Sequence, residues 1–492
     1  MPRLPPASND SVTVRWEGRE VEARSGDSIA DALYTAGIRT LTRSRKFHRP
    51  RGLSGTFAAG ALARVDGVPN VRLDRTTVRA GLDIRAQNVW PNRSIDILRL
   101  ARLIPRRWLR AGFEHPRWLP SGTRAFDRWE GFLRFMAGGG DAPDARAAGL
   151  AIAGERLSAD TVVIGGGPAG REAAARAASH GRTVILVSRG SPPGAFATAM
   201  GATLPSLSPS LRVIAGSEAF ALYRGAALVA CAPRSGGAAT LIDAKRVVLA
   251  TGRRSVPPLV PNIDLPGVLD IHAALQLVQG GGVTPGARTV LVGTGDLDAI
   301  VDRLRNLGLN IVAAAPAASL KRVVGFSSIR AVDIDASRLG CDSLIHAGPW
   351  RPDPTLPFQA GADGAFRLAT SGLPPHVTLV GSAAMPAEPV VFGGALDDRA
   401  LVCPCMDVTV AEVRDLVRRG ETHVEVIKRL TGCGMGPCQG VPCWDLLAAA
   451  LATLTGAPAE SFGHPSYRAP RGALTLAQAA GLADLVEPVA GP

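Results

Sequence analysis

The sequence is short of lysine and has no long apolar run, and both shortages restrict what the chain can be. Its lysines are Lys46, Lys245, Lys321 and Lys428, so the net charge of +13 comes almost wholly from arginine. No apolar run reaches the ~18–20 residues that a membrane-spanning helix needs. The start of the sequence lacks the basic and apolar parts of a secretory signal. We therefore expect a cytoplasmic protein that does not span a membrane.

The sequence also lacks a basic stripe interleaved with aromatic residues, the pattern of many nucleic-acid-binding surfaces. Its arginines are spread along the chain, apart from clusters at residues 43–51 and 102–110. Clusters of this kind more often pair with the phosphates of a bound nucleotide or with an acidic partner protein. We expect no nucleic acid among the partners.

Cysteine is scarce over most of the chain and concentrated near its end. Of seven cysteines, Cys231 and Cys341 stand alone, and the other five lie between residues 403 and 443. In a reducing compartment such a cluster indicates metal binding rather than disulfides.

The length of 492 residues and the apolar content of 46% allow several cores, so we expect a multidomain α/β protein. The first part of the chain predicts a β-grasp domain, followed by a connector with an exposed turn at residues 138–143. The elements expected in the β-grasp domain are a hairpin at 12–23, a helix at 28–37 capped by Asp27 or Ser28, and strands at 63–66 and 72–78.

From residue 161 the pattern changes to strand, glycine turn, helix and strand, and a weaker copy runs from residue 289 to residue 314. Two such units predict two doubly wound, Rossmann-like domains, the second inserted into the first. The domains expected are 1–95 (β-grasp), 96–158 (connector), 159–285 with 370–395 (first Rossmann-like domain), 286–369 (second, inserted domain) and 396–492 (cysteine-rich domain with short helices at 410–420 and 424–430, and tail).

The cysteine cluster provides five thiols for a site that needs four. Iron–sulfur clusters need thiolates on short loops whose backbone N–H groups approach the sulfurs, and Gly434, Gly436 and Gly440 suit that need. Four thiolates also hold zinc, but zinc sites usually separate paired cysteines by two to four residues. The single-residue gap between Cys403 and Cys405 therefore favours iron–sulfur over zinc or incidental free thiols.

A glycine turn at residues 165–170 follows an apolar strand and opens a helix, the context expected of a dinucleotide site. Its first glycine permits a tight turn, its second lets a pyrophosphate approach, and its third lets helix and strand pack. The acidic residue that normally binds the ribose is replaced by Ser188, followed by Arg189. The pyrophosphate would lie at the helix N-terminus.

Two further segments resemble those of two-dinucleotide-binding-domain flavoproteins. Residues 249–252 resemble the strand-to-turn segment, and Gly381-Ser382 follows a late strand that normally ends in Gly-Asp beside the flavin. The predicted cofactor-binding residues are Gly165, Gly167, Pro168, Ala169, Gly170, Ser188, Arg189, Ala250, Thr251, Gly252, Gly381 and Ser382. At the second turn, Gly293-Thr294-Gly295, Asp298 replaces the third small residue and would repel a pyrophosphate, which favours a purely structural role.

The cysteine segment resembles the bacterioferritin-associated-ferredoxin-like [2Fe-2S] domain in the form attached to amine and opine dehydrogenases. The resemblance is carried by Cys403-Pro404-Cys405 and by the run 434–438 with Cys443. It implies Cys403, Cys405, Cys438 and Cys443 as ligands and leaves Cys433 as an extra thiol. A set that pairs Cys433 with Cys438 stays open.

The whole chain resembles the alpha subunits of heteromeric flavin-dependent amine dehydrogenases and oxidases, which act on sarcosine, opines, proline, hydroxyproline or, as hydrogen cyanide synthase, glycine. The marks of this resemblance are the segments 43–52, 65–72, 87–91 and 111–113. In ferredoxin-like relatives the N-terminal domain carries four cysteines, and threading places Leu53, Ala58, Ala61 and Asp74 at their positions. The N-terminal cluster is therefore expected to be absent.

The resemblance implies that this chain relays electrons between FAD, or another adenine dinucleotide, and a [2Fe-2S] cluster. A beta subunit similar to D-amino-acid oxidase, with its own FAD, would oxidise the substrate, so we expect no catalytic residue here. The resemblance leaves open NAD(P), a small ferredoxin-like gamma subunit, and FMN at the interface with the beta subunit. Two other interpretations are a self-contained NAD(P)H-dependent FAD/[2Fe-2S] reductase and a non-enzymatic module that binds nucleotide and metal.

Overall fold

The computed structural model describes residues 11–54, 61–92, 95–104, 122–136, 152–223, 225–234, 236–361, 372–472, 474–483 and 485. The chain forms two compact units. The first unit comprises Met1–Ala142, Ser255–Trp350 and Glu388–Pro465, and the second comprises Pro143–Arg254, Arg351–Ala387 and Ser466–Pro492. Ala58 and the segments 111–113 and 138–143 lie outside the described residues. No helix in the described ranges is long and apolar enough to cross a membrane.

The first unit begins with the predicted β-grasp domain, a five-stranded sheet in the order β2-β1-β7-β5-β6. Its strands are β1 (Ser11–Trp16), β2 (Arg19–Arg24), β5 (Leu62–Val65), β6 (Val68–Arg72) and β7 (Asp83–Ala86). Helix α1 (Ile29–Thr35) packs on this sheet, and Ser28 caps it by accepting a hydrogen bond from the Asp31 amide. The strand predicted at 72–78 is wrong, because the edge strand β6 ends at Arg72.

A short antiparallel pair, β3 (Thr42–Arg43) and β4 (Pro50–Arg51), forms a hairpin attached to this domain. The buried Asn88 holds it, since the Thr42 hydroxyl donates to Asn88 Oδ1 over 3.0 Å. The described part of the connector contains η2 (Ile97–Leu103) and α2 (Arg124–Met136), which pack around Phe47 of the hairpin. The hairpin and the connector therefore share a small core.

The inserted doubly wound domain of the first unit has a parallel sheet in the order β15-β21-β16-β17. These strands are β15 (Val268–Asp270), β16 (Thr289–Gly293), β17 (Ile311–Pro316) and β21 (Ser343–Ala347). Helices α6 (Ile271–Gly281) and α7 (Leu297–Asn306) follow β15 and β16. A smaller antiparallel sheet contains β18 (Leu320–Gly325), β19 (Ile329–Ile334) and β20 (Ser337–Gly340).

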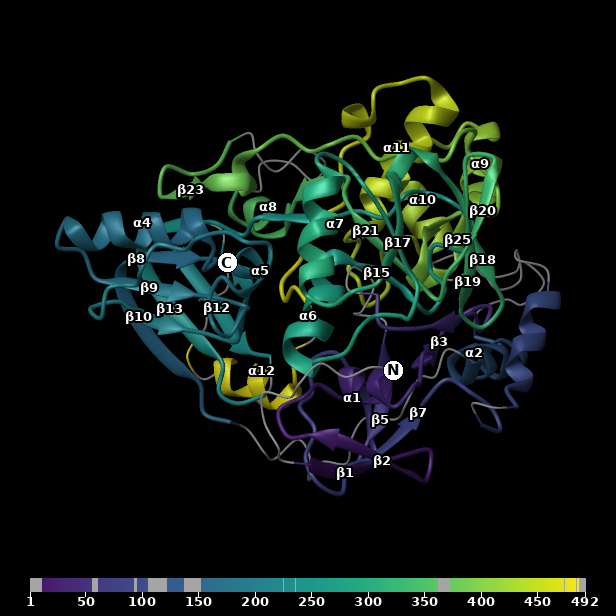
Figure 1. Cartoon of the computed structure of the whole chain (residues 1–492), viewed down its shortest axis with the longest axis horizontal. Coiled ribbons are helices and arrows are strands. Elements are labelled where there is room, and N and C mark those ends of the chain that lie inside the picture. Colours follow the sequence, from purple (N-terminus) through teal and green to yellow (C-terminus); the bar gives the residue numbers. More distant parts are fainter. Residues whose placement is uncertain are drawn as a thin grey trace. The chain divides into compact units, whose positions relative to one another are not determined.

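The cysteine-rich part of the first unit consists of short elements around α11 (Cys443–Thr455). Helix α9 (Val410–Arg418) begins with a reciprocal capping box between Thr409 and Glu412. The yellow α11 of Figure 1 packs against α9, and α10 also packs against α9. The other elements are β24 (Leu401–Cys403), η6 (Pro404–Met406), β25 (Val408–Thr409), α10 (Val424–Thr431) and η7 (Ala459–Phe462).

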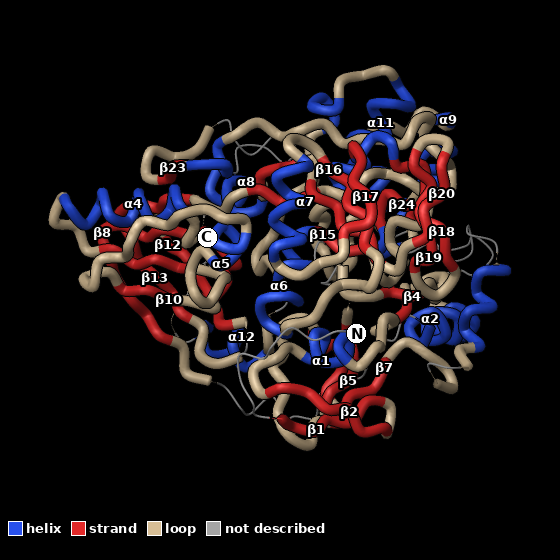
Figure 2. The backbone as a smooth tube through the Cα atoms, viewed as in Figure 1, coloured by secondary structure: helices blue, strands red, loops and turns tan. Residues whose placement is uncertain are grey.

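The second unit is a Rossmann-like domain with a sheet in the order β10-β9-β8-β13-β12-β11, and β23 pairs with β13. Figure 2 shows these strands side by side, with α4 (Pro168–Ser179) along the sheet. The strands are β8 (Glu155–Ile164), β9 (Val184–Val187), β10 (Arg212–Ile214), β11 (Ser217–Leu222), β12 (Leu228–Pro233), β13 (Thr240–Leu249) and β23 (Val377–Leu379). Its other helices are α5 (Ala195–Ala199), α8 (Thr355–Gly361), η5 (Gly381–Ala384) and α12 (Leu476–Ala483).

The C-terminal tail belongs to the second unit. Arg471 forms ion pairs with Asp353 and Glu218, and Tyr467 lies edge-on to Phe358 with ring centroids 5.5 Å apart. The chain passes between the units at β14 (Arg253–Ser255), at β22 (Trp350–Pro352) and near residues 387 and 465. The predicted multidomain α/β fold is confirmed, while the finer domain boundaries stay a prediction.

Candidate functional site

Five cysteine side chains gather at the start of α11 and on the loops that precede it. The Sγ atoms of Cys438 and Cys443 lie 3.5 Å apart, and each of these thiols contacts both Cys403 and Cys405. The main contact of Cys433 is with Cys403. The arrangement therefore supports the predicted set of metal ligands, which stays a prediction: Cys403, Cys405, Cys438 and Cys443. Cys433 lies next to this set.

Glycines let the backbone approach these sulfurs closely. The Gly434 amide donates a hydrogen bond to Cys403 Sγ over 3.4 Å. A Cβ atom at Gly436 would lie 2.5 Å from the Cβ of Cys405, so no side chain fits there. Gly434 and Gly440 both have positive φ and lie against the buried ring of Trp444. These contacts are the kind that iron–sulfur loops require.

Mutual contact among the thiols also changes their acidity. Burial raises the pKa of Cys403, but hydrogen bonds from Cys433, Cys438 and Cys443 outweigh it and hold that pKa well below its ordinary value. Contacts with Cys403 raise the pKa values of the three partner thiols. These contacts favour the thiolate, the form that binds metal, at Cys403 and disfavour it at the three partner thiols.

The spacing of Cys438 and Cys443 fits two thiolates on one metal ion. With bonds of ~2.3 Å, two thiolates of a tetrahedral ion lie about 3.8 Å apart. Within the described ranges, no group of three or more His, Cys, Asp or Glu side chains is arranged around a single ion. The Sγ spacing suits zinc and iron alike, so the preference for iron–sulfur rests on the single-residue gap between Cys403 and Cys405 in the sequence.

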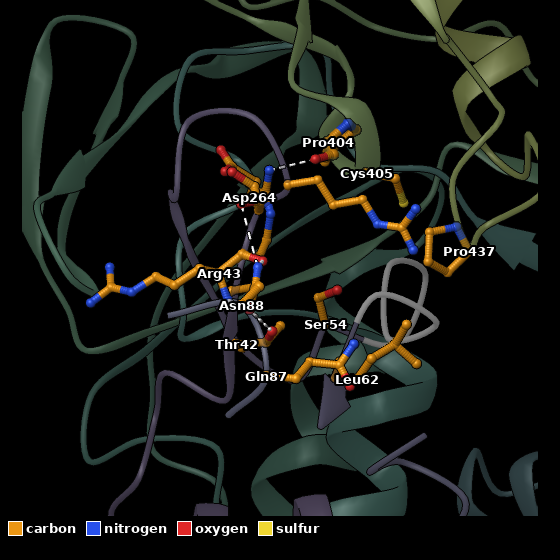
Figure 3. Close-up of a pocket in the computed structure, with 15 residues that line it drawn as sticks. Thr42, Arg43, Ser54, Leu62, Gln87, Asn88, Asp264, Pro404, Cys405 and Pro437 are labelled. Carbon is orange, nitrogen blue, oxygen red and sulfur yellow. Dashed lines mark hydrogen bonds and ion pairs between the residues drawn. The ribbon is translucent and has the colours of Figure 1, made fainter. Parts of the chain in front are cut away.

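An open pocket lies beside Cys405. Figure 3 shows Cys405 and Pro437 at one side of it and Thr42, Gln87 and Asn88 at the other. Three of its lining residues are the arginines Arg43, Arg45 and Arg51, against one lining carboxylate, Asp264. Among the lining residues positive charge outnumbers negative charge, so the pocket favours anions.

In the second unit, the predicted glycine turn joins β8 to α4. Gly165 has φ 118°, and a Cβ atom there would lie 2.1 Å from the Ala250 carbonyl oxygen. A Cβ atom at Gly170 would lie 1.9 Å from the carbonyl oxygen of Gly165, which explains the tight packing of α4 on the strand. Gly167 has open space in front of it and is the N-cap of α4, so a pyrophosphate can approach the helix N-terminus.

The other predicted flavin-site residues lie next to this turn. Gly381 follows β23 with φ 61°, and a Cβ atom there would lie 2.5 Å from the Cβ of Ala169. Gly252 has φ 73°, with Ser382 Oγ close to its open side. The buried hydroxyl oxygen of Thr251 has no hydrogen-bond partner among the described residues. An orphaned hydroxyl beside an open glycine turn fits a bound dinucleotide.

The ribose position differs from the usual pattern, as the sequence indicates. Ser188 is buried, and its hydroxyl donates to the Gly190 carbonyl over 3.2 Å, while Arg189 is exposed. Sequence reasoning missed Arg171, whose guanidinium donates to the carbonyl oxygens of Gly166, Pro193 and Pro205. Arg171 thereby ties the glycine turn to the loop after β9.

The second glycine turn, between β16 and α7, is surrounded by acidic groups. The Thr294 hydroxyl and the Trp350 amide both donate to Glu388 Oε2, over 2.7 and 3.0 Å. Asp296 caps α7, and Asp298 lies in its first turn. Three carboxylates at the place of a pyrophosphate favour the structural role predicted for this turn.

In the inserted domain, Ser255 and His346 form a buried pair that resembles a catalytic nucleophile with its general base. Ser255 Oγ lies 2.7 Å from His346 Nδ1, and the Gly348 amide donates to the same hydroxyl. Ser255 is 0% exposed and His346 2% exposed, so substrate cannot reach the pair. We therefore assign it a structural role.

Three sequence families match parts of the chain. Residues 9–89 match a 2Fe-2S iron-sulfur cluster binding domain, residues 159–297 a pyridine nucleotide-disulphide oxidoreductase, and residues 397–482 the sarcosine oxidase A3 domain. The range of the first match contains no cysteine in this chain. A 2Fe-2S cluster and FAD, the two predicted cofactors, are supported by these matches together with the cysteine cluster and the glycine turn.

The chain is 27% identical to the alpha subunit of sarcosine oxidase from Rhizobium meliloti (strain 1021), over 88% of this chain and 54% of that protein. It is 35% identical to the A subunit of opine oxidase from the same organism, over 18% of this chain and 19% of that protein. With the A subunit of opine oxidase from Agrobacterium tumefaciens (strain Ach5) the identity is 30%, over 28% and 32%. The chain thus spans about half or less of the length of these curated relatives.

The structure of L-proline dehydrogenase from P. horikoshii has the same fold, with a TM-score of 0.72 and 23% identity over 96% of this chain and 98% of that one. The predicted resemblance to alpha subunits of heteromeric flavin-dependent amine and opine oxidases is therefore confirmed. The Rossmann-like domain of the second unit and the cysteine-rich part of the first unit both lie in the regions that carry this resemblance.

Proposed function

We propose that this chain is the electron-transfer alpha subunit of a heteromeric flavoprotein dehydrogenase or oxidase that acts on amines or amino acids. The observation that carries the proposal is the convergence of Cys403, Cys405, Cys438 and Cys443 in a chain similar to the alpha subunit of sarcosine oxidase. When bound, a [2Fe-2S] cluster supplies one-electron transfer and FAD supplies two-electron transfer.

In this proposal a partner subunit removes hydride from the carbon beside the substrate nitrogen. This chain contributes the cofactor sites, and its one buried serine–histidine pair in the described ranges is closed to substrate. The arginine-lined pocket beside Cys405 supports an anionic redox group, such as the FMN implied by the resemblance, as the electron donor. The location proposed for the complex is the cytoplasm.

The alternative of a self-contained NAD(P)H-dependent reductase is disfavoured by Glu388, which lies where the second pyrophosphate would bind. To test the proposal, the chain is purified with its partner subunit under anaerobic conditions. Sarcosine, proline, hydroxyproline, octopine and nopaline are then added in turn. One of them should bleach the flavin and reduce the cluster, whereas bleaching by NAD(P)H alone would support the reductase.

A further inference from the structure

The hairpin of residues 42–51, here called the basic hairpin, projects from the N-terminal domain toward the cysteine cluster. Its two strands are closed by mutual hydrogen bonds, in which the Ser44 amide donates to the Arg49 carbonyl and the Arg49 amide to Ser44 Oγ, each over 2.9 Å. In its loop, Nδ1 of the buried His48 lies 3.1 Å from a carboxylate oxygen of Asp96, the residue that caps η2. The hairpin is therefore held at its loop.

The basic hairpin holds the loop that carries Cys403 and Cys405. Arg51 donates to the carbonyl oxygen of Pro404 over 2.5 Å and to Asp407 Oδ1 over 3.1 Å. The other oxygen of Asp407 accepts the Lys46 and Phe47 amides, over 3.2 and 3.1 Å. Asp407 is fully buried and has φ 53°, so the loop keeps this unusual conformation through these four hydrogen bonds.

The same hairpin also holds the loop that leads to Cys438. The Lys46 ammonium donates to the Thr431 carbonyl over 3.0 Å, at the end of α10. The Thr431 hydroxyl accepts the Cys433 amide over 3.1 Å, and the next amide, of Gly434, donates to Cys403 Sγ. Lys46 thereby positions the backbone amide that approaches a predicted ligand.

The two cations of these contacts are largely removed from water. Arg51 has a side chain that is 12% exposed, and Lys46 is 8% exposed. Arg51 and Arg49 share Asp264, and Arg51 also pairs with the buried Asp407, so the two carboxylates balance the two arginines and loss of the Arg51 charge would leave negative charge beside the cluster. A cluster gains one negative charge when it accepts one electron, and cations in a poorly hydrated site stabilise that reduced form.

We propose that the N-terminal domain, which matches a 2Fe-2S cluster binding domain but has no cysteine, serves as a clamp for the C-terminal cluster. Arg51 positions the Cys403–Asp407 loop, Lys46 positions the Thr431–Gly434 loop, and both charges favour the reduced cluster. The inference rests on the proposed function for its redox part. It gives this domain a role that needs no cluster of its own.

The geometric part is tested by hydrogen–deuterium exchange on the metal-free full chain. Arg51→Gln should speed exchange of the 401–409 peptide, and Lys46→Met that of the 430–438 peptide. Each rate should rise on the order of tenfold, because charged hydrogen bonds are lost. The matched control is Arg72→Gln, since Arg72 is also about one-tenth exposed and pairs with Asp74 in the same domain. Arg72→Gln should leave the exchange rates of both peptides unchanged.

The redox part is tested on the full chain loaded with iron and sulfide, by spectroelectrochemistry. Arg51→Gln should lower the ratio of reduced to oxidised cluster at a fixed potential by about tenfold, which is 59 mV for one electron. Arg51→Lys keeps the charge but loses the forked contact, so it should keep the redox ratio and still speed exchange of the 401–409 peptide. If Arg51→Gln does not fold, Arg51→Lys takes its place in the exchange experiment and Lys46→Met takes its place in the redox experiment, where it should lower the ratio in the same direction.

Unchanged exchange in the Arg51 and Lys46 variants overturns the clamp, and an unchanged redox ratio in Arg51→Gln overturns the role of the charge. If the unmodified chain holds no iron and sulfide, the proposed function fails. The exchange experiment on the metal-free chain still decides the clamp in that case.

Discussion

The hydroxyl of Thr294 lies 2.7 Å from Glu388 Oε2, at the turn where a second dinucleotide would place its pyrophosphate. A carboxylate there repels phosphate and already occupies the donors at the turn. We therefore predict that NADH and NADPH leave the flavin of the isolated chain oxidised. Anaerobic titration followed at the flavin absorption band is the measurement. Stoichiometric bleaching would show that the turn binds a nicotinamide dinucleotide after all.

Two substitutions in the glycine turn of the second unit separate effects on folding from effects on FAD binding. Gly167 has φ −73°, and a Cβ atom there would have nothing within 4 Å, so Gly167→Val should fold with a melting temperature close to that of the flavin-free parent. Its side chain would fill the approach of the pyrophosphate, so bound FAD should be lost. Bound flavin is measured by absorbance after gel filtration.

Gly170→Ala provides the contrast to this variant, because its Cβ would lie 1.9 Å from the Gly165 carbonyl oxygen and should destabilise the unit itself. Full retention of flavin by Gly167→Val would show that the dinucleotide lies elsewhere.

Substitution of Thr251 should have different effects on the stability of the flavin-free protein and on the binding of FAD. Its buried hydroxyl oxygen has no partner among the described residues, so Thr251→Val should leave the flavin-free chain as stable or slightly more stable. If the hydroxyl bonds to FAD, the same change should weaken FAD binding by about 1 kcal/mol, or roughly fivefold. Thermal melting and equilibrium titration with FAD measure the two effects. Equal destabilisation of both forms would contradict a role in binding.

His346 makes the inserted domain sensitive to mild acid. Burial lowers the pKa of His346 to about 4, helped by the charge of His272 and opposed by that of Asp270. Between this value and the ordinary 6.5, the unfolded chain binds more protons than the folded chain, so stability falls as the pH falls through that window. The loss should amount to about 3 kcal/mol. The free energy of unfolding of the metal-free chain is measured in urea across this pH range. His346→Gln should remove most of its pH dependence. An unchanged dependence on pH in this variant would show that other groups cause it.

The repeating units of the fold could be predicted from the sequence because their signals are local. Both strand–turn–helix–strand units lie in the structure where the sequence predicts them, and Ser28, one of the two caps predicted, caps α1. The strand predicted at 72–78 is misplaced because Pro69 and Asn70 suggest a turn. In the structure β6 is an edge strand, where proline costs no ladder hydrogen bond.

The cysteine site could be predicted only in part. The spacing of the cysteines and glycines indicates the cluster, since these residues are close in sequence. The clamp could not be inferred, because Lys46 and Thr431 are 385 residues apart and no sequence pattern relates them. The cluster of basic residues at 43–51 is visible in the sequence, but it indicates only an anionic partner. The same holds for Glu388, 94 residues from Thr294.

The central claim is that Cys403, Cys405, Cys438 and Cys443 hold a [2Fe-2S] cluster while Cys433 stands beside it. Iron, acid-labile sulfide and visible absorption, measured on Cys438→Ser and Cys433→Ser prepared side by side, test it most directly. Cys438→Ser should lose iron, sulfide and absorption, and Cys433→Ser should keep nearly all of them. Loss in Cys433→Ser with retention in Cys438→Ser, or zinc without sulfide in the parent chain, would contradict the account.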